Sequence, residues 1–95
     1  MSYRIEFERQ AFQQLRKLDP QICKKIMERI RDLKENPRRF PLLSRTLTGF
    51  RKIALGTPGG EYRVVYTIDE ELKAVNIVFV GPRENFYKEL QRYLS

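Results

Sequence analysis

The chain has 95 residues, and its 19 lysines and arginines against 12 aspartates and glutamates give a formal net charge of +7. This length fits one domain, expected over residues 1–95, and 41% hydrophobic residues suffice for a core. The lack of histidine excludes Ser-His-Asp triads, and the single cysteine excludes Cys-ligated zinc. No apolar run fits a membrane span or a signal peptide, so we expect a cytoplasmic protein without metal or cofactor.

The positive charge is concentrated in the first half of the chain. Residues 1–48 hold twelve basic and six acidic side chains, whereas residues 49–95 hold seven and six. An excess of this size on a small domain is typical of polyanion binders, although it also serves solubility alone. Nucleic acid is therefore the first partner to consider.

The first half of the chain predicts a strand followed by two helices. Polar and apolar residues alternate over 2–7, as in a half-buried strand. Apolar residues then recur at helical spacing over about 8–18 and again over about 20–35. Asp19-Pro20 starts the second helix and Asn36-Pro37 stops it, so the two helices form an antiparallel hairpin. Residues 36–48 carry two prolines and no regular period, which indicates a surface loop.

The second half predicts a three-stranded antiparallel meander and a short terminal helix. Segments 50–55, 61–68 and 74–80 are rich in β-branched and aromatic residues, and turn residues separate them. The acids at 69–71 are expected to be solvated turn residues rather than metal ligands. Apolar residues at helical intervals over 84–94 predict the last helix. The expected fold class is therefore α+β.

Strand alternation divides the predicted sheet into a core face and an open face. The core face is expected to hold Ile53, Leu55, Tyr62, Val64, Tyr66 and Ile68. The open face then holds Lys52, Ala54, Arg63, Val65 and Thr67. Arg83 and Tyr87, four residues apart, share one side of the terminal helix. A concave site lined by Lys52, Arg63, Arg83 and Tyr87 follows from this geometry.

These four side chains suit RNA cleavage by attack of a ribose 2′-OH on the adjacent phosphate. Arginines hold a phosphate and stabilise the charge of the transition state. A tyrosine among cations favours its phenolate form and would accept the 2′-OH proton, while a lysine would protonate the leaving oxygen or add positive charge. The alternative is that Lys52 and Arg63 are ordinary solvent-side residues and Tyr87 packs under the sheet.

Three local sequences carry a family resemblance: FRKIAL at 50–55, GEYRVVY at 60–66 and VGPRENFY at 80–87. Together with the order of elements they resemble the RelE/ParE toxin superfamily over nearly the whole chain, and RelE-like mRNA interferases in particular. The resemblance implies the RelE-like microbial RNase fold and a metal-independent endoribonuclease that acts in the ribosome. It places catalytic roles on Lys52, Arg63, Arg83 and Tyr87.

The chain departs from this pattern in two ways, one of which is that Tyr87 follows Arg83 more closely than in some family members, and it leaves two other functions open. The family often has a second lysine where this chain has Ala54, with neighbouring Arg51 as a substitute. ParE-like relatives share the fold but poison DNA gyrase. A catalytically inactive homologue that only binds its antitoxin is the third alternative.

The resemblance also implies partners. They are a cognate antitoxin protein, the 70S ribosome with its mRNA, and operator DNA bound by a toxin–antitoxin hetero-oligomer. The basic side chains expected to meet ribosomal RNA are Lys24, Lys25, Arg29, Arg31, Arg38, Arg39 and Arg51.

Overall fold

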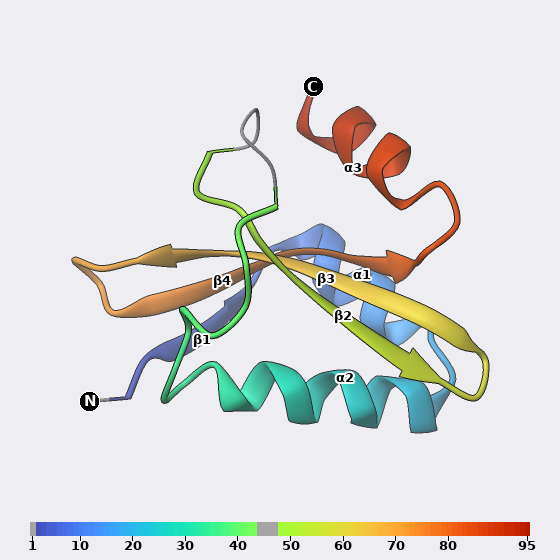
Figure 1. The fold of residues 1–95 in the computed structure, drawn as a ribbon, viewed down its shortest axis with the longest axis horizontal. Helices are drawn as coiled ribbons and strands as arrows, with labels where there is room; N and C mark the ends of the chain where they lie inside the picture. Colours follow the sequence, from blue (N-terminus) through green and yellow to red (C-terminus); the bar gives the residue numbers. More distant parts are fainter. Residues whose placement is uncertain (1, 44–47) are drawn as a thin grey trace.

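A computed structural model describes residues 2–43 and 48–95 and contains a four-stranded sheet in the order β1-β4-β3-β2 (Figure 1). The strands are β1 (Arg4–Phe7), β2 (Arg51–Thr57), β3 (Gly60–Asp69) and β4 (Ala74–Pro82). Strands β2, β3 and β4 pair antiparallel as a meander, and β1 pairs parallel with β4. The predicted α+β class and the meander are confirmed.

Two helices, α1 (Arg9–Arg16) and α2 (Pro20–Asp32), follow β1 and pack on one face of the sheet (Figure 1). The predicted start of α2 is confirmed, because Asp19 Oδ1 accepts a hydrogen bond from the Gln21 N–H at 2.9 Å and Pro20 is the first helical residue. Both helices end two or three residues earlier than predicted. Tight turns replace their last helical turns, since the N–H groups of Leu18 and Leu33 bond to carbonyls three residues back.

The main core lies between these helices and the sheet. It buries Ala11, Leu15, Ile26, Ile30, Leu33, Ile53, Leu55, Val64, Tyr66, Val75, Ile77 and Val80. Strand residues expected on the core face are present here, and Tyr62, Ile68 and Cys23 pack against this cluster. The alternation of side chains in β2 and β3 is therefore confirmed.

The other face of the sheet is not open along its whole length, which corrects the sequence-based expectation. Helix α3 (Phe86–Leu94) crosses it and buries a second cluster of Val65, Val78, Phe79, Phe86 and Leu90 (Figure 1). Val65 is fully buried there. An irregularity in the pairing next to Val65 leaves Val78 without a partner in β3, so Val78 and Phe79 both enter this cluster. A short amphipathic helix needs an apolar surface, and these side chains provide it.

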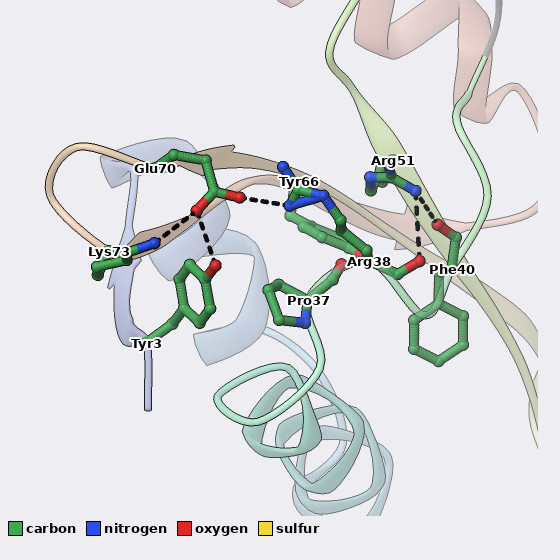
Figure 2. Close-up of polar contacts among 8 residues, drawn as sticks. All are labelled: Tyr3, Pro37, Arg38, Phe40, Arg51, Tyr66, Glu70 and Lys73. Atoms are coloured by element: carbon green, nitrogen blue, oxygen red, sulfur yellow. Dashed lines mark hydrogen bonds and ion pairs between the residues drawn. The ribbon is translucent and has the colours of Figure 1, made fainter. Parts of the chain in front are cut away.

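The segment after α2 is fixed to the sheet by polar contacts, which Figure 2 shows. The buried Tyr66 hydroxyl donates to the Pro37 carbonyl at 2.6 Å, and Leu42 forms a bridge with Arg51. Glu70 is more than the solvated turn residue expected, because it accepts hydrogen bonds from Tyr3 at 2.7 Å and Lys73 at 3.1 Å and pairs with Arg38. The part of the predicted loop at 44–47 lies outside the described residues.

Candidate active site

Three predicted site residues meet where β2, β3 and α3 come together. Lys52 Nζ donates a hydrogen bond to Tyr87 Oη at 3.0 Å. The Arg63 guanidinium carbon lies 5.1 Å from the centre of the Tyr87 ring, and Lys52 Nζ lies 5.7 Å from it. Arg63 therefore contacts the Tyr87 ring, where a cation is favourably placed, and Lys52 contacts the hydroxyl of the same side chain.

The register of the sheet and the burial of α3 produce this meeting. Ala54 pairs with Arg63 and Lys52 pairs with Val65, so Lys52 and Arg63 are diagonal neighbours on one face. Phe86 is buried in the second cluster, and the adjacent Tyr87 is 38% exposed and extends toward β2. Tyr87 therefore does not pack under the sheet, which was the alternative reading of its position.

Arg83 lies in the turn between β4 and α3, not on the helix that it was expected to share with Tyr87, because α3 begins only at Phe86. Its backbone N–H donates to the Glu61 carbonyl at 3.0 Å, which continues the pairing of β3 and β4. Asn85 then adopts a left-handed conformation with φ of 58°, and this turns α3 back over the sheet. The Arg83 side chain is exposed, and its charge acts on the Glu61 carboxylate.

Glu61 is a functional candidate that the sequence-based reasoning missed. Its Oε2 accepts a hydrogen bond from Arg63 Nε at 2.8 Å. This hydrogen bond, together with the positive charges of Arg63, Arg83 and Lys52, holds the pKa of Glu61 below its usual value. The signal was available, because Glu61 precedes Arg63 by two strand positions and so shares its face.

Arg51 does not substitute for the second family lysine in this structure. Its guanidinium lies on the other side of β2 and donates to the Phe40 carbonyl at 2.7 Å and to the Arg38 carbonyl at 3.5 Å (Figure 2). Ala54 is exposed opposite Arg63, and its methyl side chain carries no charge. The cluster of candidate site residues, Lys52, Arg63, Arg83 and Tyr87, therefore has one lysine on β2.

The predicted RNA-binding cations of the helical half are all exposed. Lys24, Lys25, Arg29 and Arg31 lie on α2, on the opposite side of the sheet from α3. Lys25 and Arg29, with Glu28 between them, also line a hollow of about 310 Å³ together with Ala54, Leu55 and Gly56 of β2. The basic side of α2 thus reaches the edge strand that carries Lys52.

Two more of these cations have intramolecular partners. Arg38 pairs with Glu70, and Arg39 lies 3.9 Å from an Asp32 carboxylate oxygen and 5.4 Å from the centre of the Phe40 ring. Within residues 2–43 and 48–95, no three His, Cys, Asp or Glu side chains come together as ligands for a metal ion. None of the helices in the described ranges has the length and apolar character that a membrane crossing needs.

Solved structures with a similar fold include toxins of the RelE type. A mutant of the E. coli toxin RelE in the free state superposes with a TM-score of 0.79, at 26% identity, with both chains covered completely. The RelBE2 toxin–antitoxin complex from Mycobacterium tuberculosis matches with a TM-score of 0.75 at 34% identity over 87% of this chain and 93% of that one. The fold is thus that of a RelE-like toxin domain.

Sequence comparison identifies the family. The family model for the ParE toxin of type II toxin–antitoxin systems matches residues 5–87 of this sequence. The mRNA interferase toxin RelE of E. coli K12 is 30% identical over 84 residues, which are 88% of this chain and 86% of the relative. The chain belongs to the RelE/ParE family of type II toxins, as the resemblance predicted.

Proposed function

We propose that this toxin is an endoribonuclease that cleaves mRNA in the ribosome. The observation that carries the proposal is the hydrogen bond of 3.0 Å from Lys52 to Tyr87 with Arg63 over the same ring. This arrangement places a proton-transfer group beside groups that bind phosphate. The names of the E. coli and Shigella flexneri relatives, mRNA interferases, support it.

In the proposed reaction the ribose 2′-oxygen attacks the adjacent phosphorus, and the bond from phosphorus to the 5′-oxygen breaks. Tyr87 takes the 2′-OH proton, and the Lys52 ammonium stabilises the phenolate that the reaction requires. Arg63 and Arg83 hold the phosphate and stabilise the charge that develops on it. The leaving 5′-oxygen takes a proton from Lys52 or from water. No metal ion takes part.

Dependence on the ribosome follows from the modest strength of these groups. The chain has no histidine to act as a base near neutral pH. A codon held in the ribosome supplies the orientation that a small, open site does not supply alone. The exposed cations of α2, with Arg38, Arg39 and Arg51 at its carboxyl end, are proposed to contact ribosomal RNA.

Regulation by a cognate antitoxin is part of the same proposal. The relatives from E. coli and M. tuberculosis were solved as complexes with their antitoxins. An antitoxin segment is expected to cover the basic surface, and the toxin–antitoxin hetero-oligomer is expected to bind operator DNA.

Tyr87→Phe tests the function directly, because it keeps the ring and removes the hydroxyl. On mRNA-programmed ribosomes the variant should cleave more slowly by about a hundredfold or more, with unchanged ribosome binding. The matched control is Tyr93→Phe in the same helix, whose hydroxyl donates to Glu8 at 2.8 Å away from the cluster. The measurement is primer extension of the cleaved mRNA, with chemical identification of the 2′,3′-cyclic phosphate on the upstream fragment.

Two outcomes would contradict the proposal. Efficient cleavage of free RNA at physiological salt would remove the ribosome from the function. A wild-type protein that cuts no mRNA but inhibits supercoiling by purified DNA gyrase would replace the nuclease with the ParE-like function, in which Tyr87→Phe has little effect.

A further inference from the structure

Glu61 contacts both arginines of the cluster through different atoms. Its side-chain Oε2 accepts from Arg63 Nε at 2.8 Å, and its main-chain carbonyl accepts from the Arg83 N–H at 3.0 Å. The Arg63 side chain is only 16% exposed, compared with 34% for Glu61. One residue thus holds the side chain of Arg63 and the backbone of Arg83.

The atom of Arg63 that Glu61 binds decides what remains available. An arginine offers one N–H at Nε and two NH₂ groups at its end. Because the carboxylate takes the Nε hydrogen, both terminal groups stay available for the two oxygens of a phosphate. The same contact fixes the guanidinium over the Tyr87 ring, 5.1 Å from its centre. The catalytic arginine is therefore oriented before any substrate arrives.

A second role for Glu61, as the base that takes the 2′-OH proton, is disfavoured by the same contacts. Three cations surround its carboxylate and hold its pKa below the usual value, and a weakly basic carboxylate takes up protons poorly. The tether to Nε also occupies the oxygen that faces Arg63.

We propose that Glu61 is a positioning residue that orients Arg63 for phosphate binding, an inference that rests on the proposed RNA cleavage. Orientation before binding removes an ordering cost from the reaction. The carboxylate also repels the RNA phosphate, so it lowers affinity while raising the rate. Removal of Glu61 should consequently separate binding from catalysis.

The test compares Glu61→Ala, Glu61→Gln and Glu84→Ala in single-turnover cleavage on programmed ribosomes. Glu61→Ala should lower the maximal rate by about tenfold to a hundredfold, with equal or tighter binding of the ribosome. Glu61→Gln retains an oxygen that can accept from Nε and should recover most of the rate. Glu84→Ala, an equal change of charge at an exposed position beside Arg83, should keep the wild-type rate.

Each contrary result has a defined meaning. A wild-type rate for Glu61→Ala would overturn the positioning role. A Glu61→Gln rate as low as that of Glu61→Ala would show that charge or proton transfer, rather than orientation, is what Glu61 supplies, and would overturn it as well.

A measurement without activity separates this inference from the proposed function. The ¹H–¹⁵N signal of Arg63 Nε, assigned by its loss in Arg63→Lys, should exchange slowly with water in the wild type and faster in Glu61→Ala. Equal exchange rates in the two proteins would overturn the positioning role even if the ribonuclease is active. If the Arg63 Nε hydrogen exchanges slowly in a wild-type protein that cleaves no mRNA, the contact between Glu61 and Arg63 stands, and the proposed ribonuclease activity is refuted.

Discussion

The two faces of the sheet differ in what covers them and in what they leave exposed. Within the described residues, the core between α1, α2 and the sheet buries twelve residues, all of them hydrophobic, whereas the core between α3 and the sheet buries five. Beside the second core, the same face carries Lys52 and Arg63, and both contact Tyr87 of α3. Since burial of apolar surface is the main source of stability, most of the stability comes from the first face and the proposed chemistry is confined to the second.

The small cluster under α3 nevertheless serves the site. Phe86 and Leu90 fix the helix on Val65 and Phe79, and the ring of Phe86 meets that of Tyr87 edge to face at 5.6 Å between centres. A helix of nine residues at the chain end would not keep its position without this packing. The second core therefore determines where the Tyr87 hydroxyl lies.

The largest expected effect comes from the arginines of the α3 face. Arg63→Ala or Arg83→Ala removes a donor to the phosphate, so cleavage on ribosomes should fall by about a hundredfold or more, equivalent to about 2.7 kcal/mol. Stability should change by less than about 1 kcal/mol, because Arg63 loses only a partly exposed ion pair and a contact with an aromatic ring.

The matched control for these variants is Arg4→Ala, which removes an exposed arginine paired with Glu6 on β1. It should leave both cleavage and urea unfolding unchanged. Loss of cleavage in Arg4→Ala equal to that in Arg63→Ala would mean that total charge, rather than the cluster, drives the activity.

Tyr66→Phe tests the face of the sheet under α1 and α2. Tyr66 lies on β3, the strand that also carries Arg63. The variant removes the buried hydrogen bond of 2.6 Å to the Pro37 carbonyl and leaves that oxygen without its donor. Unfolding free energy should fall by about 1 to 3 kcal/mol. Cleavage by the folded protein should stay at the wild-type rate, so a loss of rate without a loss of stability would break the division between the faces.

The pH dependence of stability sharpens this prediction. Burial raises the pKa of Tyr66 above its ordinary value of 10.0, with the charge of Arg51 opposing the rise. A group whose folded pKa is raised contributes stability that is present below the unfolded pKa and is lost as pH rises through the folded pKa. Wild-type stability measured by urea unfolding should therefore fall above pH 10, and Tyr66→Phe should lack this part of the fall.

Much of the fold follows from local patterns in the sequence. Period-two alternation gives the faces of β2 and β3, and the Asp19-Pro20 pair gives the start of α2. The burial of Val65 under α3 could not be predicted. It depends on the left-handed turn at Asn85 and on the irregularity of β4 that leaves Val78 without a partner in β3. Neither feature has a periodic signal in the sequence.

The site was predictable where alternation and helical spacing act alone. Alternation placed Lys52 and Arg63 on one face, and helical spacing added Arg83 and Tyr87, although Arg83 lies in the turn before α3 and not on the helix. Glu61 was missed because its role depends on a contact with Arg63, although its strand position was readable. The direction of Arg51 depends on the path of residues 38–40, which no local pattern specifies.

The smallest expected effect comes from adding, at Ala54, the second lysine that the family resemblance implies. Ala54 is exposed, faces Arg63 across the strands, and lines the hollow beside Lys25 and Arg29. In Ala54→Lys one more cation should meet RNA phosphate, so a fourfold rise in salt should weaken ribosome binding about threefold more than in the wild type. The proximity of Arg63 should cost about 0.2 to 1 kcal/mol of stability, because like charges on paired strands repel.

Ala54→Gln, which adds length without charge, should show the wild-type salt dependence in the same binding measurement. An unchanged salt dependence in Ala54→Lys would mean that the edge of β2 lies away from RNA, and the path from the basic side of α2 to the site would have to run elsewhere.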